Sequence, residues 1–126
     1  MSFVYDAGVL VAADRNEARI WAEHKVRLEM GAIPLVPALV VAQVSRSPRQ
    51  IQLRRFLSGC IVVPFGENEA HEAGHLLAAT RTADVVDAAV VVVAVREKAE
   101  VILTSDTGDI DRLVRASGRE IAVFAV

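Results

Sequence analysis

The sequence has 126 residues, of which 53% are hydrophobic and 24% are charged, and its formal net charge at pH 7 is −2. This length predicts one domain over residues 1–126, and the hydrophobic content is sufficient for a core, which excludes a disordered chain. The net charge excludes a uniformly basic nucleic-acid-binding protein, although a local basic patch remains open. The single cysteine, Cys60, excludes an internal disulfide framework and a multi-cysteine metal site.

The beginning of the chain and its apolar runs indicate neither a leader nor a membrane span. Met1 leads directly into SFVYD, without the basic start and apolar run of a signal peptide. The longest apolar run, AAVVVVAV at 88–95, is far shorter than the roughly 20 residues that cross a bilayer. We therefore expect a cytoplasmic protein.

Short apolar segments alternate with helical patterns along the chain. We expect strands at 2–6, 33–37, 60–65, 100–106 and 120–126. We expect helices at 8–15, 16–30, 37–44, 47–57, 67–81, 83–99 and 107–117. This alternation predicts the α/β class, with a mainly parallel central sheet of about five strands flanked by helices.

The segment 83–99 is the ambiguous one, because its valines favour a strand. It is too long for a strand, is rich in alanine and begins near Asp84, a suitable N-cap. We therefore predict a helix.

Residues 71–75 read HEAGH and match the H-E-x-x-H motif of zinc proteases. Helical spacing places His71 and His75 on one face, but on the polar face of their helix. A catalytic zinc needs a third protein ligand, and the only other histidine, His24, lies in a distant charged helix. We favour a solvated helix face over a zinc site or adventitious surface metal binding.

Aspartates occur where strands end and where helices begin. In a parallel α/β sheet the C-terminal ends of the strands share one edge with the starts of the neighbouring helices. The acids that should meet there are Asp6, Asp84, Asp87, Asp106 and Asp109. Two of these positions have ordinary structural explanations, because Asp84 suits an N-cap and Asp109 suits the positive end of a helix dipole. Neither capping nor solvation explains well why Asp6 and Asp87 are acidic.

Carboxylates gathered without matching lysines repel one another, and a divalent cation relieves this repulsion. Ligands that are all oxygen suit Mg²⁺ or Mn²⁺ rather than zinc. Such a site can activate water and neutralise charge on a phosphate group. No G-x-x-x-x-G-K loop occurs, so the phosphate would belong to a substrate such as nucleic acid.

Four arginines fall within ten residues, at Arg46, Arg49, Arg54 and Arg55. Two readings stay open for them, a solvated helix face and a patch that binds phosphates. A phosphoaspartyl domain is disfavoured, because AGV follows Asp6 without a second acid and no lysine lies beyond Lys98.

The chain resembles the PIN-domain ribonuclease toxins of VapBC toxin–antitoxin pairs over essentially its whole length. The pieces that carry the resemblance are VYDAGVLVAADR, VPALVVAQVSR, DVVDAAVVVVA and ILTSDTGDIDRL, in this order and spacing. The resemblance implies a single PIN-like domain and a Mg²⁺- or Mn²⁺-dependent endoribonuclease acting on RNA, often tRNA or rRNA. It also implies a homodimer and a cognate VapB-like antitoxin that blocks the acidic pocket.

The same resemblance assigns roles to residues. It implies catalytic roles for Asp6, Asp87 and Asp106, which together with Asp109 would hold the metal. Supporting polar roles fall on Gln43, Asp84, Thr104 and Ser105. RNA-binding roles fall on Arg46, Arg49, Arg54 and Arg55.

One position departs from the family pattern, which commonly has glutamate where this chain has Gln43. Glutamine offers a neutral carbonyl oxygen but neither a charge nor a base. Either the remaining carboxylates suffice, or the protein binds RNA or antitoxin with little cleavage. We expect retained activity, because Asp6, Asp87 and Asp106 are all present.

Overall fold

The computed structural model describes all residues from 1 to 126 and contains one five-stranded sheet in the order β3-β2-β1-β4-β5. Every neighbouring pair of strands is parallel. The strands are β1 (Phe3–Tyr5), β2 (Leu35–Pro37), β3 (Ile61–Val63), β4 (Val101–Thr104) and β5 (Ala122–Ala125). The predicted α/β class and the parallel sheet of five strands are therefore confirmed.

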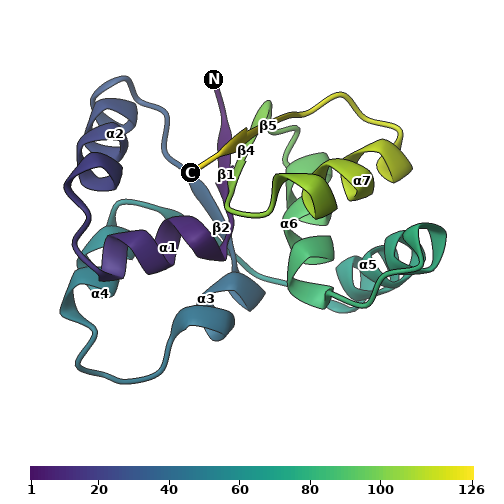
Figure 1. Cartoon of the computed structure of the whole chain (residues 1–126), viewed down its shortest axis with the longest axis horizontal. Helices are drawn as coiled ribbons and strands as arrows, with labels where there is room; N and C mark the ends of the chain where they lie inside the picture. The colour runs from purple at the N-terminus through teal and green to yellow at the C-terminus, as the bar shows by residue number, and fades with distance from the viewer.

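Seven helices flank this sheet. They are α1 (Ala7–Asp14), α2 (Ala18–Glu29), α3 (Ala38–Val44), α4 (Ile51–Ser58), α5 (Glu67–Thr80), α6 (Val85–Arg96) and α7 (Thr107–Ser117). Figure 1 shows α1, α2 and α4 on one side of the strands and α5, α6 and α7 on the other. None of the helices is long and apolar enough to cross a membrane.

The valine-rich segment forms helix α6, as predicted. Eight consecutive residues, from Asp87 to Ala94, are buried, because α6 lies between the sheet and the helices α5 and α7. A helix that is buried on all sides is apolar all round, which explains why no amphipathic pattern marks it. Asp84 caps it, since the Asp84 Oδ1 accepts a hydrogen bond from the Asp87 N–H at 3.0 Å.

The helix predicted at 47–57 begins later than expected, at Ile51. Residues 45–50 form a loop that the Gln50 side chain holds. Its Oε1 accepts from the N–H groups of Arg46 and Ser47, and its Nε2 donates to the Asp14 carboxylate at 3.0 Å. Pro48 also disfavours helical backbone at the residue before it, so the prediction was wrong for the first four residues.

The C-terminal ends of the strands carry the region of interest. Tyr5 pairs with Leu103 in the parallel register, so the chain leaves β1 and β4 at the same edge of the sheet. Figure 1 shows that α1, α3, α6 and α7 all begin near this edge. The topology thus brings together the starts of four helices from distant parts of the chain.

Candidate metal centre

Asp6 is the residue that connects β1 to α1, and it is only 4% exposed. Its Oδ1 accepts a hydrogen bond from the Ala7 N–H at 2.6 Å, so it caps α1. We expected no capping role for this residue, and that expectation was wrong. The sequence signal was present, since Asp6 directly precedes a helical pattern.

Thr104, the last residue of β4, is fully buried and links two of the predicted site residues. Its hydroxyl donates to the Asp6 Oδ2 at 2.6 Å and accepts from the Asp106 N–H at 2.9 Å. The hydroxyl therefore ties the end of β1 to the turn that follows β4. This turn positions Asp106 at the start of α7.

Asp87 is 6% exposed, and its Oδ2 is buried without any hydrogen-bond partner. Burial, and then the negative charges of Asp6, Asp84, Asp106 and Asp109, raise its pKa from 3.8 to about 7. A buried carboxylate oxygen without a donor is unfavourable, and so is its approach to other carboxylates. All five predicted acids therefore converge on this part of the molecule.

Asp106 and Asp109 lie at the start of α7 and are exposed. The Asp106 Oδ1 accepts from the Asp109 N–H at 3.4 Å, which caps the helix. Carboxylate oxygens of Asp87, Asp106 and Asp109 all lie within 4.8 Å of one another. The only cation paired with them is Arg112, whose Nη1 lies 3.8 Å from the Asp109 Oδ1 at an exposed position.

This arrangement fits a divalent cation bound by oxygen ligands. The three carboxylates offer the donor atoms that Mg²⁺ and Mn²⁺ prefer, and the orphaned Asp87 oxygen lacks a partner that a cation would supply. Asp6 is not one of these three residues, and each of its oxygens accepts one hydrogen bond, which leaves lone pairs that a cation can use. Burial raises its pKa, and these two hydrogen bonds oppose the increase.

Comparison with known proteins adds to this geometry. The family model for the PIN domain matches residues 3–116. The chain belongs to the PIN domain family. PIN domains are generally nucleases and typically use divalent metal ions, in agreement with the acidic cluster.

Two solved structures share this PIN fold. One is the crystal structure of VapBC2 from Rickettsia felis bound to a DNA fragment from their promoter, with a TM-score of 0.73 and 16% identity over 100% of this chain and 99% of that one. The other is FitAcB from Neisseria gonorrhoeae, with a TM-score of 0.62 and 16% identity over 97% and 96% of the chains. A search of curated proteins by sequence found no match.

The residues predicted to have supporting polar roles lie in different surroundings. Gln43 is exposed on α3, makes no side-chain hydrogen bond, and lies on a helix that packs against α6. Ser105 is exposed between β4 and α7, beside Asp106. Asp84 serves as the cap of α6, and Thr104 holds Asp6, as described above.

The four clustered arginines are placed on the loop before α4 and on α4 itself. Arg46 folds back onto the end of α3, where its Nη1 donates to the carbonyl oxygens of Ala42 and Ser45. Arg55 lies over the ring of Trp21, with 5.8 Å between its Cζ and the ring centroid. Arg49 and Arg54 are exposed and form no ion pair.

The HEAGH segment lies on α5, away from the acidic cluster. His71 and His75 are exposed, and Glu72 forms an ion pair with Arg96 at 2.7 Å. His24 is not on a charged surface as expected but is 3% exposed, with its Nδ1 2.9 Å from the Tyr5 hydroxyl. No group of three potential metal ligands includes His71 or His75, so the HEAGH segment has no third protein ligand for a zinc ion.

Sequence reasoning did not identify Gly8, which lies in the first turn of α1. A Cβ atom at this position would lie 2.5 Å from the Ser105 Oγ and 2.6 Å from its Cβ. The absence of a side chain therefore allows the turn after β4 to approach α1. The small residues that follow Asp6 were the available signal.

Proposed function

We propose that this protein is the toxin component of a type II toxin–antitoxin system, a Mg²⁺- or Mn²⁺-dependent endoribonuclease that hydrolyses RNA phosphodiester bonds. The observation that carries the proposal is the buried, unpartnered carboxylate oxygen of Asp87 beside the carboxylates of Asp106 and Asp109. Membership of the PIN domain family supports the nuclease chemistry. The likeness to VapBC2 supports a cognate VapB-like antitoxin as the inhibitor.

In this proposal Asp87, Asp106 and Asp109 would hold the cation together with Asp6, whose negative charge acts on the neighbouring Asp87. A bound Mg²⁺ or Mn²⁺ supplies an acidified water and offsets negative charge on the phosphate oxygens. The hydrogen bonds from Ala7 and Thr104 keep the Asp6 carboxylate in one orientation. A fixed orientation matters because misplaced groups lose much of their effect on the reaction.

The proposal extends to partners and location. Arg46, Arg49, Arg54 and Arg55 would contact phosphates of a tRNA or rRNA substrate, since exposed arginines can pair with phosphate oxygens. The protein would act as a homodimer in the cytoplasm. The antitoxin would cover the acidic cluster and so prevent access of RNA.

A second candidate function follows from Gln43. Where related sequences commonly have glutamate, this residue adds no charge to the acidic cluster. The protein would then bind RNA or antitoxin with little cleavage. The variant Gln43→Glu separates the two candidates, because it should increase cleavage strongly only if the missing charge limits the parent protein.

The direct test is incubation of purified protein with total tRNA and rRNA in the presence of Mg²⁺, Mn²⁺ or a chelator. We expect metal-dependent fragments whose ends can be mapped by sequencing, and we expect Asp87→Asn to abolish them. His71→Ala is the matched control, because His71 is exposed and distant from the acids. Cleavage by Asp87→Asn at the parent rate would contradict the assignment.

A further inference from the structure

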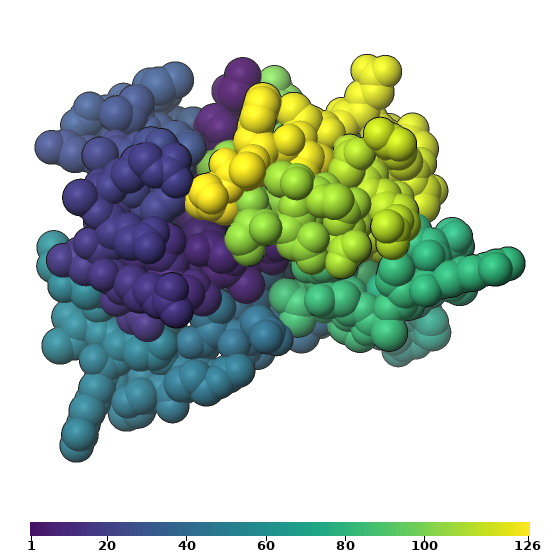
Figure 2. Space-filling model, in the orientation of Figure 1, coloured from purple at the N-terminus to yellow at the C-terminus, as the bar shows by residue number.

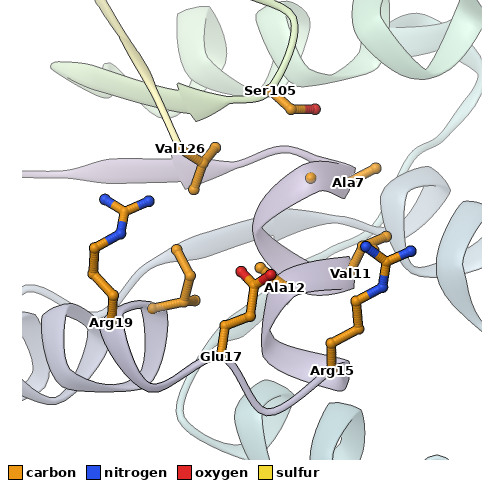
Figure 3. A pocket seen from close by; sticks show the side chains of 10 residues that line it. Ala7, Val11, Ala12, Arg15, Glu17, Arg19, Ser105 and Val126 are labelled. Carbon is orange, nitrogen blue, oxygen red and sulfur yellow. The ribbon is translucent and has the colours of Figure 1, made fainter.

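A pocket of about 410 Å³ lies along α1, beside the acidic cluster. Ala7 and Gly8, directly after Asp6, line one end of it, and Ser105, directly before Asp106, lines the same end in close contact with Gly8. Figure 3 shows Ala7 and Ser105 together with Arg15, Glu17 and Arg19. We call this cavity the arginine pocket.

The arginine pocket and the acidic cluster share their structural walls. The close contact between Gly8 and Ser105 joins the first turn of α1 to the turn after β4, which also carries Asp106. From this contact the pocket follows α1 to Arg15, and the eight residues of the helix span about 12 Å. Figure 2 shows the yellow C-terminal end of the chain next to the purple and dark-blue segments that contain α1 and α2, and the last residue, Val126, also lines the pocket.

The charged groups of the pocket come from the junction between α1 and α2. Asn16 adopts a left-handed conformation, with φ 59°, which turns the chain between the two helices. Arg15 and Arg19 therefore reach the pocket from its two sides, with Glu17 between them (Figure 3). Arg15 forms no ion pair or side-chain hydrogen bond, and Arg19 has only an exposed contact of 3.3 Å with Glu23.

Charge considerations indicate what such a pocket can bind. A polyanion placed over five aspartates needs cations close to its flanking phosphates, because the acids themselves repel it. Arg15 and Arg19 supply cations that line the same pocket as the residues next to Asp6 and Asp106. Glu17 repels a phosphate but accepts hydrogen bonds from the amino groups of bases.

The remaining lining is apolar and small. Val11 and Ala12 are half-buried and Ile20 is buried, so this part of the pocket is an apolar floor that can contact the face of a base. The volume falls in the range of about 300–1,000 Å³ that small-ligand sites occupy. Unstacked bases of single-stranded RNA are commonly bound against such surfaces and against arginine side chains.

We propose that the arginine pocket binds one nucleotide of single-stranded RNA next to the cleavage point, with its two flanking phosphates on Arg15 and Arg19 and the amino edge of its base on Glu17. This inference rests on the proposed nuclease function, since the acidic cluster defines the cleavage point. In this proposal the junction between α1 and α2 selects which RNA sequence is cut.

The test measures RNA binding separately from cleavage. The probe is a fluorescein-labelled single-stranded RNA of random sequence, about 12 nucleotides long, and its anisotropy is followed with the Asp87→Asn protein. In this background we expect Arg15→Gln and Arg19→Gln each to weaken binding roughly tenfold and to lower the salt dependence by about one released ion. The matched control is Arg119→Gln, which removes an exposed arginine from a different pocket, formed with Lys98 and Glu120.

Glu17→Gln, made in the parent protein, tests the contact with the base. We expect cleavage to continue with a changed distribution of bases next to the cut, as mapped by sequencing. An unchanged distribution would refute the contact between Glu17 and the base.

The possible failures are distinguishable. Suppose that the parent cleaves RNA, and that Arg15→Gln and Arg19→Gln change neither RNA binding in the Asp87→Asn background nor cleavage when made in the parent. The pocket proposal is then wrong and the nuclease proposal stands. If the parent does not cleave RNA, but RNA binding still depends on Arg15 and Arg19, the nuclease proposal is wrong and the assignment of the pocket to RNA binding stands. If Arg15→Gln and Arg19→Gln weaken binding of the antitoxin but leave RNA binding intact, the pocket contacts the antitoxin and the pocket proposal is overturned.

Discussion

Replacement of Asp87 by asparagine should stabilise the metal-free protein and at the same time abolish metal binding and cleavage. The parent residue keeps an unpartnered oxygen among four other carboxylates, and its pKa is raised from 3.8 to about 7. Above that pH the folded protein must ionise Asp87 against burial and repulsion, whereas the unfolded chain ionises it freely. An asparagine amide is neutral and can donate to the surrounding carboxylates.

The magnitude follows from the pKa. One pKa unit corresponds to about 1.4 kcal/mol, so a rise from 3.8 to about 7 corresponds to at most about 4 kcal/mol at pH values above 7. Asp106 and Asp109 are exposed, and water screens their repulsion, so we expect about 2 kcal/mol. For a chain of this length, this corresponds to an increase in Tm of about 8 °C.

The sign of the pH dependence is also determined. The folded state retains the Asp87 proton between pH 3.8 and about 7, where the unfolded chain has lost it, so the unfavourable contribution grows as pH rises through this window. The stability difference between Asp87→Asn and the parent should therefore be larger at about pH 8 than at about pH 5.

The assay is thermal and chemical unfolding of both proteins in a chelator and in a series of Mg²⁺ concentrations. Added Mg²⁺ should stabilise the parent, because a ligand that binds only the folded state shifts the equilibrium, and should leave the variant unchanged. The reasoning would be refuted if the metal-free variant unfolded at a lower temperature than the parent at pH 8, or if Mg²⁺ stabilised both proteins equally. Glu120→Gln, which makes the same change from carboxylate to amide at an exposed position outside the acidic cluster, is the control.

Two further predictions concern buried polar groups. Burial, and then the charge of Arg27, lower the His24 pKa from 6.5 to about 4. As the pH falls, the unfolded chain therefore takes up a proton before the folded protein does. The free energy of unfolding should decrease below pH 6.5, by at most about 2 kcal/mol at pH 5. Urea unfolding should show this loss in the parent and not in His24→Phe; equal pH dependence in both would exclude His24 as its source. Thr104→Val should destabilise the protein by about 1–3 kcal/mol and reduce cleavage, because Asp6 and the Asp106 N–H each lose a hydrogen-bond partner. Thr104→Ser retains the hydroxyl and should retain most of the activity, whereas equal losses in both variants would show that the methyl group matters instead.

Much of the framework was determined by the sequence itself. Alternating apolar strands and helical patterns predicted the parallel sheet, because parallel strands require helical crossovers between them. The same rule predicted that Asp6 and Asp106, which follow strands, would meet the acids that open α6. These inferences succeeded because they depend on chain order and periodicity, which are local properties.

The tertiary structure decided which groups actually meet. It selected Asp87, Asp106 and Asp109 as the close group, and left Asp6 with its oxygens bonded to Ala7 and Thr104. It also buried His24, which lies in a helix of otherwise charged appearance.

The loop at 45–50 and the arginine pocket likewise depend on contacts between distant segments. Gln50 reaches Asp14, and Ser105 reaches Gly8. Such pairs are separated by tens of residues in the sequence. The physical reason is that hydrogen bonds, desolvation and steric approach act over a few ångströms in space, and only the folded chain determines which residues lie that close.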